Sequence, residues 1–312
     1  MRSRQVLPVA VLAALALAAP ARANFVVGLS EQNPAVFDSP IWQSLKLKRI
    51  RYVVPWDWFR HRGQDAQVVN FMSRARAAGQ DVVVTFSAPR SCYVNGRYRK
   101  TKACRAPSQK VYAAAVKRFT RAYPWVRTYC PWNEENHVSQ PTHGNPRLAA
   151  QYYATMRRVA AGKTVLAADV LDQSDVGSYV GRFLRYSHGK GRIWGLHNYK
   201  DVNRHRATGL KTVLRLAPGQ VWLTETGGIV TFLPQFKTSL ARAARATRYM
   251  FSLAATYSRR RAGNRSKVTR LYDYRWFGER KGARFDAGLV NPNGTPRPAL
   301  AVFKKGIKGR AR

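Results

Sequence analysis

Two short stretches of the chain hold the residue types that acid–base and nucleophilic chemistry requires. The chain has 55 Lys and Arg but only 15 Asp and Glu among 312 residues. Three of its five glutamates, Glu134, Glu135 and Glu225, stand in the aromatic-rich stretches "YCPWNEENHVSQPT" (129–142) and "VWLTETGG" (221–228). The alternative is that they are ordinary loop carboxylates that balance an Arg-rich surface. Their scarcity elsewhere and their aromatic neighbours favour chemistry.

Two carboxyl groups that face each other across a pocket are the groups that hydrolyse glycosidic bonds. One donates a proton to the leaving oxygen, and the other attacks the anomeric carbon or activates water. Glu134 and Glu225 are far apart in the sequence. The fold must therefore bring two distant segments together if they are to act as such a pair.

Short β-branched or aromatic runs recur along the chain, separated by polar loops and helical patterns. The eight runs are residues 24–30, 49–56, 81–87, 125–133, 164–170, 192–199, 220–226 and 268–276. Convincing helical patterns occupy residues 65–79, 108–123, 145–162 and 239–260. Ser108 is a typical N-cap, and Pro146 and Gly162 are typical of a helix start and a helix end.

Eight strand–helix units in one chain predict an α/β fold, a single (β/α)8 TIM barrel that spans residues 24–312. A doubly wound open sheet is the alternative. It would show a Gly-rich phosphate turn after the first strand, and "VVGLSEQNPA" (26–35) has none. Catalytic groups of a barrel come from the C-terminal ends of its strands, which share one face. Glu134 directly follows the fourth run and Glu225 is the second-last residue of the seventh, so we expect both acids at that face.

Several motifs resemble those of clan A glycoside hydrolases, the "4/7 superfamily". The stretch "WNEENH" (132–137) resembles the Trp-Asn-Glu-Pro-Asn motif that ends strand four, and "WLTETGG" (222–228) is similar to the strand-seven nucleophile motif. The second strand of the clan is similar to "IRYVVPW" (50–56), and its strand-six His-x-Tyr to "HNY" (197–199). Trp276 stands at the place of the strand-eight Trp beneath the sugar.

This resemblance implies a retaining β-glycosidase that acts on a polysaccharide or oligosaccharide and uses no cofactor and no metal. It implies that Glu134 is the acid/base and Glu225 the nucleophile. Asn133 would hold the sugar 2-hydroxyl, Tyr199 would orient Glu225, and Arg51 would help to keep Glu225 ionised. Glu134 needs a raised pKa to carry a proton, whereas Glu225 must remain a carboxylate.

Aromatic and histidine side chains complete the expected pocket. Trp276 and Trp58 are the expected stacking surfaces for sugar rings, and His197 is expected to form hydrogen bonds within the pocket. Core packing is the alternative for any of the tryptophans, including Trp56 and Trp132, because all are large hydrophobic residues. Two further histidines in the loop after Glu134, at positions 137 and 143, lack the spacing of a closed set of metal ligands.

Glu135 departs from the motif, because it stands where the clan has Pro. A second carboxylate beside Glu134 could raise the pKa of Glu134 by like-charge repulsion, or it could point outward. We expect it to point outward, because neighbouring residues at a strand end face opposite sides.

The first 23 residues read as a secretory signal peptide. Basic residues precede the apolar run "LPVAVLAALALAA" (7–19), and "ARA" (21–23) fits a cleavage site. A membrane anchor, the alternative, needs about 20 apolar residues. We therefore expect a secreted protein without a membrane span. Among its three cysteines, Cys92 and Cys104 are expected to form a disulfide around the tight-turn pair Asn95-Gly96, and Cys130 to be a buried free thiol.

The charge is extreme. Removal of three arginines with the leader lowers the formal net charge from +40 to +37. Such a field attracts anionic surfaces, including the cell envelope, but no motif indicates specific nucleic-acid binding. We expect a monomer. Two other functions stay open: a catalytically silent carbohydrate-binding barrel that adheres to anionic envelope glycans, and a basic protein that adheres by charge alone. Hydrolysis is not separable from sugar transfer, nor endo from exo action.

Overall fold

The parallel strands of the molecule are those that the sequence predicts, with one of them broken in two. The computed structural model describes residues 25–94, 97–99, 101, 104–308 and 310. The expected signal peptide lies outside the described residues, so its cleavage stays a prediction. The strands of the main sheet are β1 (Val26–Ser30), β2 (Arg49–Pro55), β3 (Asp81–Ser87), β6 (Thr128–Cys130), β7 (Thr164–Val165), β8 (Asp169–Leu171), β9 (Ile193–His197), β10 (Gly219–Thr226) and β12 (Ser266–Tyr274).

These strands form one parallel sheet in the order β7-β6-β3-β2-β1-β12-β10-β9-β8. Strands β7 and β8, at its two ends, are the halves of the predicted strand 164–170. The segment between them closes the sheet, because the Leu166 amide donates to the Tyr129 carbonyl at 2.9 Å and the Ala167 amide donates to the Ile193 carbonyl at 2.7 Å. The predicted (β/α)8 barrel is confirmed.

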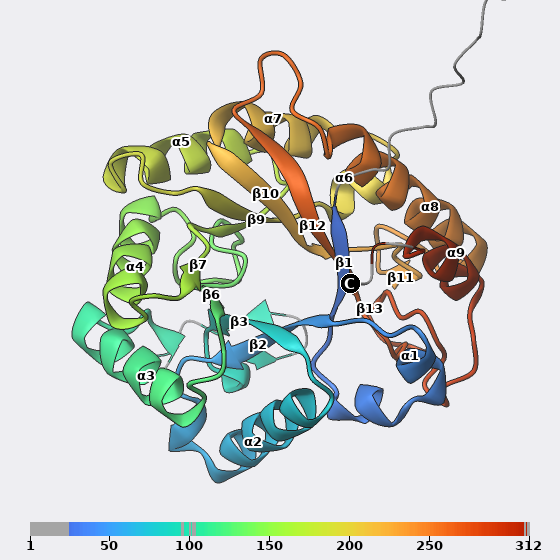
Figure 1. The fold of residues 1–312 in the computed structure, drawn as a ribbon, viewed down its shortest axis with the longest axis horizontal. Coiled ribbons are helices and arrows are strands. Elements are labelled where there is room, and N and C mark those ends of the chain that lie inside the picture. Colours follow the sequence, from blue (N-terminus) through green and yellow to red (C-terminus); the bar gives the residue numbers. More distant parts are fainter. Residues whose placement is uncertain (1–24, 95–96, 100, 102–103, 309, 311–312) are drawn as a thin grey trace, which may run out of the picture.

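The helices lie around the strands, as the view in Figure 1 shows. They are α1 (Pro40–Ser44), α2 (Arg62–Ala77), α3 (Gln109–Ala122), α4 (Pro146–Val159), α5 (Val176–Tyr186), α6 (Tyr199–Asn203), α7 (Thr208–Leu216), α8 (Leu240–Tyr257) and α9 (Pro298–Gly306), with 3-10 turns η1 (Pro34–Asp38), η2 (Trp58–Arg60) and η3 (Arg90–Cys92). The Ser108 side chain accepts from the Val111 amide, as expected of an N-cap, and Pro146 begins α4. No helix in the described part of the chain has the length and apolarity that crossing a membrane requires.

Apolar side chains fill both sides of the sheet. The main core lies between the strands and the helices. A second, small cluster joins side chains that come from separate strands around the barrel, and it fills the barrel interior as a packed layer. Its buried members are Val83, Cys130, Leu166, Trp222 and Tyr272. Cys130 is a buried free thiol, as predicted.

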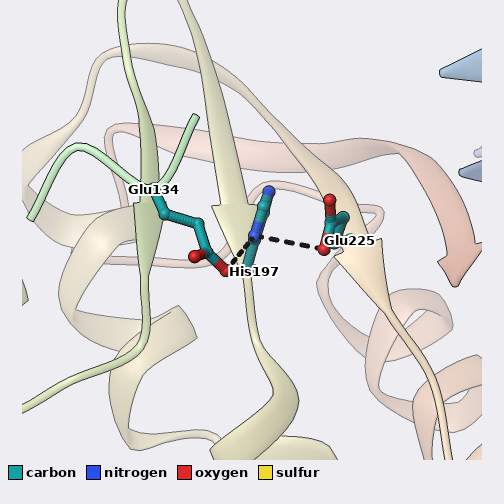
Figure 2. A group of neighbouring side chains, drawn as sticks. All are labelled: Glu134, His197 and Glu225. Atoms are coloured by element: carbon teal, nitrogen blue, oxygen red, sulfur yellow. Dashed lines mark hydrogen bonds and ion pairs between the residues drawn. The ribbon is translucent and has the colours of Figure 1, made fainter. Parts of the chain in front are cut away.

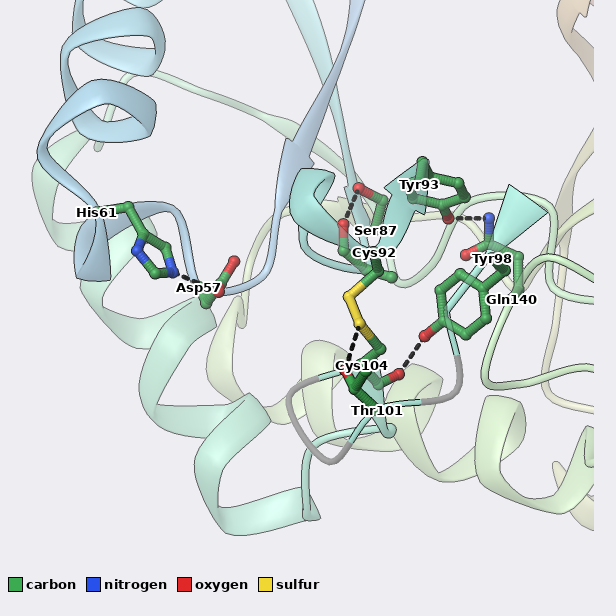
Figure 3. The surroundings of a disulfide bond; sticks show 10 residues. Asp57, His61, Ser87, Cys92, Tyr93, Tyr98, Thr101, Cys104 and Gln140 are labelled. Atoms are coloured by element: carbon green, nitrogen blue, oxygen red, sulfur yellow. Dashed lines mark hydrogen bonds and ion pairs between the residues drawn. A yellow bond between two sulfur atoms is a disulfide. The ribbon is translucent and has the colours of Figure 1, made fainter. Parts of the chain in front are cut away.

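Two small antiparallel pairs stand outside the barrel sheet. Strands β11 (Thr231–Phe232) and β13 (Phe285–Asp286) pair with each other, as do β4 (Tyr93–Val94) and β5 (Arg97–Tyr98). The turn predicted at Asn95-Gly96 lies outside the described residues. The predicted disulfide is confirmed: Cys92 and Cys104 are bonded, with their Cα atoms 5.6 Å apart (Figure 3).

Candidate active site

Glu134 and Glu225 meet at one end of the barrel although different strands carry them. Glu225 is the penultimate residue of β10, and Glu134 follows β6 in a turn where its φ is 48°. One oxygen of each carboxylate and a ring nitrogen of His197 all lie within 4.8 Å of one another. Figure 2 shows the imidazole between the two carboxylates. The chain therefore places two acids around a single point, as a two-carboxylate reaction requires.

Arg51, on β2, forms a buried ion pair with Glu225. Its guanidinium is fully buried. It donates to Glu225 Oε1 at 2.5 Å, and its other terminal nitrogen donates to Asp169 Oδ2 and to Asn133 Oδ1, both at 2.7 Å. Burial alone would lower the pKa of Arg51, but the charges of Asp169 and Glu225 raise it above its usual value. Arg51 is therefore a permanent cation that fixes the position of Glu225.

His197, at the end of β9, is the second cation of the site. Its Nδ1 lies 3.1 Å from Glu134 Oε1 and 3.6 Å from Glu225 Oε2, and its Nε2 lies 3.2 Å from Asp169 Oδ2. Burial would lower the pKa of His197, but Asp169 and Glu225 outweigh burial and raise it to about 10. The imidazole is therefore protonated at neutral pH. It does not border the cavity itself but is fully buried beneath it, where it contacts Glu134, Glu225 and Asp169.

Asp169, on β8, is a site residue that the sequence reasoning missed. It is fully buried, lies next to both cations, and accepts a hydrogen bond from the Thr224 hydroxyl. Burial would raise the pKa of Asp169, but His197 and Arg51 lower it well below its usual value. The signal was present, because an acid inside the otherwise apolar run "TVLAADV" (164–170) must face a buried partner.

The electrostatics of Glu134 differ from the expectation for a resting acid. Burial would raise the pKa of Glu134, but the hydrogen bond and the charge of His197 lower it below its ordinary value. Glu134 is therefore ionised, and the proton resides on the imidazole, whose Nδ1 lies 3.1 Å from Glu134 Oε1.

Tyr199 and Asn133 lie where the resemblance implies. The Tyr199 hydroxyl donates to Glu225 Oε2 at 3.3 Å. Burial and the charge of Glu225 raise the pKa of Tyr199 well above its usual value, so the phenol keeps its proton. The Asn133 carbonyl oxygen accepts from Arg51. Because that bond uses the oxygen, the amide NH2 of Asn133 is directed to donate to a ligand.

The prediction that Glu135 points outward is wrong. Its side chain is fully buried, and its two carboxylate oxygens have no hydrogen-bond partner among the described residues. Burial and the nearby charge of Asp169 raise the pKa of Glu135 well above its usual value. Strand alternation failed here because β6 ends at Cys130, and the positive φ of Glu134 turns the next side chain inward.

The predicted tryptophan surfaces are also wrong. Trp276 is 0 % exposed and Trp58 4 % exposed, and neither borders the cavity above the acids. Trp58 packs edge-on against Phe119 in the core. Strand β12 ends at Tyr274, so the predicted strand 268–276 ran two residues too far. Tyr274, not Trp276, is the strand-end aromatic residue that borders the cavity.

A cavity of about 670 Å³ lies above the acids. Asn133, Glu134 and Glu225 border it together with six aromatic side chains, which are Tyr93, Tyr199, Phe232, Phe236, Tyr274 and Phe285. A cavity of this size, with aromatic walls and polar side chains that can fix the orientation of a ligand, is typical of a small-molecule or oligosaccharide site.

The donor atoms of Glu134, His197 and Glu225 lie close enough together to hold a metal ion. Two features of the site disfavour it. Arg51 already donates to Glu225, and a protonated imidazole presents an N–H rather than a lone pair. The expectation of a metal-free site stays a prediction.

Solved structures with a similar fold are glycoside hydrolases. The GH5_18 protein from Streptomyces cattleya, in complex with GlcNAc, aligns with 91 % of this chain and 80 % of its own at 12 % identity and a TM-score of 0.62. A family 39 glycoside hydrolase from Bacteroides cellulosilyticus WH2 aligns with 90 % of this chain and 63 % of its own, at 15 % identity and a TM-score of 0.58. A psychrophilic family 10 endo-β-1,4-xylanase aligns with 90 % of this chain and 96 % of its own, at 12 % identity and a TM-score of 0.59.

Identities this low show the fold alone. The chain has a (β/α)8 barrel that is similar to the barrels of these glycoside hydrolases. Neither the family models nor the curated protein sequences compared with the chain match it.

Proposed function

We propose that the protein is a secreted, retaining glycoside hydrolase that cleaves β-glycosidic bonds of a polysaccharide or oligosaccharide. The spacing of Glu134 and Glu225 carries the proposal, since one oxygen of each lies within 4.8 Å of the other. Retaining enzymes hold their two carboxyl groups about 5–5.5 Å apart, whereas inverting enzymes leave about 6.5–9.5 Å for a water molecule. The likeness to solved glycoside hydrolases supports the same reaction.

In this proposal Glu225 attacks the anomeric carbon and Glu134 protonates the leaving oxygen. Arg51 and Tyr199 aim Glu225 through its two oxygens. The proton begins on His197. As Glu225 bonds to the sugar it loses its negative charge, the imidazolium loses one of its stabilising anions, and its proton passes to Glu134 and on to the leaving group. Glu134 then removes a proton from the water that frees the sugar from Glu225.

The test is hydrolysis of a panel of polysaccharides by residues 24–312, with products identified by mass spectrometry and the anomer first released identified by NMR. We expect the released sugar to keep the β-configuration. Glu134→Gln should lower kcat by about 10²–10⁴-fold, and Glu225→Gln should abolish turnover.

Glu279→Gln is the matched control, because it makes the same substitution at a partly exposed residue that pairs with Arg275 and does not border the cavity. It should leave turnover unchanged. Turnover that is unchanged in both Glu134→Gln and Glu225→Gln would refute the assignment, and binding without cleavage of any glycan would favour a silent carbohydrate-binding barrel. An inverted product would refute the retaining mechanism.

Secretion and attachment to an anionic cell envelope belong to the same proposal. They rest on the leader-like residues 1–23 and on the formal net charge, which is +40 for the whole chain. Cell fractionation tests both. The protein should lie outside the membrane, and salt above about 0.5 M should release it from the envelope, since ions screen exposed charges.

A further inference from the structure

Cationic side chains border the cavity in positions that the proposed reaction does not use. They are Arg90, Lys200 and Arg204. The acids that border it are Glu134, Glu225 and Asp172. Whether the cavity favours a charged ligand depends on which of these six side chains already have partners inside the protein.

All three acids are occupied. Arg51 donates to Glu225, and His197 pairs with Glu134. Asp172 accepts from the backbone amides of Lys200 and Asp201, at 3.2 and 2.6 Å. Burial raises the pKa of Asp172 to about 7, so it carries only part of a negative charge at neutral pH. Each of these acids therefore already has a partner within the protein.

Two of the cations have no such partner. Lys200 and Arg204 are exposed, and no carboxylate of the described residues lies within 4 Å of either charged group. Arg90 differs, because it already donates to Gln67 at 2.6 Å. Lys200 and Arg204 are four residues apart on α6 and its C-cap, so they lie on one face, about 6 Å apart along the helix axis.

The wall beside α6 restrains Arg204. Its guanidinium lies over the ring of Phe236, 5.8 Å from the centroid, and Arg242 lies over the same ring at 5.0 Å. Arg242 is held there by the backbone carbonyls of Lys237 and Val230. Phe236 therefore lies against two guanidinium groups, and only that of Arg204 is left without a hydrogen bond among the described residues.

Lys200 and Arg204 border the same cavity as Glu134 and Glu225. Lys200 directly follows Tyr199, whose hydroxyl donates to Glu225. Arg204 is one helical turn farther along the same wall. A sugar held at Glu225 would therefore place its neighbours in the chain next to these two cations.

We infer that the substrate is an anionic β-glycan, and that Lys200 and Arg204 bind a carboxylate or sulfate group one or two sugars from the cleaved bond. This inference rests on the proposed function and names its substrate class. Charge-assisted hydrogen bonds to carboxylate or sulfate are stronger than those to neutral hydroxyls, so the charged group selects among glycans of similar backbone.

Binding to the Glu225→Gln protein tests the inference without cleavage. Three sets of oligosaccharides share one β-linked backbone. Chondroitin oligosaccharides carry carboxylates, and those of carboxyl-reduced chondroitin sulfate carry sulfates. Those of carboxyl-reduced chondroitin are neutral. Glucuronoxylan oligosaccharides before and after carboxyl reduction supply a second backbone. Calorimetry at 50 mM and 300 mM NaCl gives each Kd.

We expect at least one charged ligand to bind about tenfold or more tightly than its neutral form at 50 mM NaCl, with the preference reduced at 300 mM. The pair Lys200→Gln and Arg204→Gln should remove most of this preference and leave neutral binding within about twofold. The control pair, Lys110→Gln and Arg121→Gln, makes the same charge change at exposed residues of α3 and outside the cavity. It should keep the preference.

Equal binding of charged and neutral forms on both backbones would overturn the inference, as would an equal loss in the control pair. Whichever charged oligosaccharide binds more tightly, the one with carboxylates or the one with sulfates, identifies the group that Lys200 and Arg204 bind. Cleavage of neutral glycans alone by the wild type would leave the proposed function standing and refute only the substrate class. Charge-selective binding without any cleavage would instead refute the hydrolase proposal.

Discussion

Replacement of His197 by Gln should make the stability of the protein depend on pH in a new way. The imidazole is fully buried and lies within 3.6 Å of an oxygen of Glu134, Glu225 and Asp169. Its pKa rises from 6.5 to about 10 in the folded protein. Gln has a similar reach but no charge, so the variant removes the cation and keeps a hydrogen-bonding group in the site.

The sign follows from linkage between protonation and folding. Because the folded state raises the pKa of His197, its protonation stabilises the fold fully below about pH 6.5, and that stability is lost as the pH rises toward 10. The shift corresponds to about 5 kcal/mol below pH 6.5 and to about 1.4 kcal/mol at pH 9. The free energy of unfolding of the wild type should therefore exceed that of the His197→Gln variant, and this difference should shrink steadily as the pH rises above 6.5.

Urea unfolding of both proteins between pH 6 and 9.5 measures this margin. His137→Gln is the control, because its imidazole is near Glu134 but lies 3.9 Å away and is partly exposed. That variant should stay within about 0.5 kcal/mol of the wild type throughout. A margin for His197→Gln that does not change with pH would refute the charged-imidazole reasoning, even if the variant is less stable.

Three further predictions address the buried acid, the disulfide and the aromatic wall. Glu135 keeps its proton in the folded state above pH 4.5, where the unfolded chain releases it, so Glu135→Gln should gain stability over the wild type by up to about 1.4 kcal/mol per pH unit above that value. A difference in unfolding free energy between the two proteins that does not change with pH would contradict this prediction. Replacing Cys92 and Cys104 by Ser should cost about 3 kcal/mol of stability and should raise KM more than it lowers kcat, because the bridged hairpin carries Tyr93 to the cavity (Figure 3); an unchanged KM would count against that role. Tyr274→Ala should weaken oligosaccharide binding several-fold at nearly unchanged stability, whereas Trp276→Ala should cost about 3–5 kcal/mol of stability, and the reverse pattern would restore Trp276 as the sugar platform.

The strands and the two glutamates were predictable because local signals determine both. Short runs of β-branched and aromatic residues indicate the strands. The geometry of a barrel then brings the C-terminal ends of the fourth and seventh strands to one face. Asp169 was missed although its place in an apolar run indicates a buried partner, because the identity of its partners, Arg51 and His197, is set by contacts between strands. Each of these residues is on a different strand, and no pattern within one segment records such contacts.

The errors concern where strands end and which way the next residue points. Trp276 and Tyr274 are two residues apart, so alternation alone places them on the same side of the strand. The structure distinguishes them because β12 stops at Tyr274 and Trp276 turns into the core. Glu135 was misplaced for the same reason, since the turn at Glu134 ended the alternation on which its outward direction depended.

The role of Asp169 becomes clear from the balance of charge beneath the sugar. Arg51 and His197 are both cations, and on their own they would neutralise Glu134 and Glu225 completely. Asp169 pairs with both cations from the buried side, so the five groups together keep one net negative charge. In the proposed reaction positive charge develops at the anomeric carbon, and a site that is already negative and fixed in position stabilises it without reorganisation. The two cations orient the reacting acids, and Asp169 prevents that orientation from cancelling the field which the reaction needs.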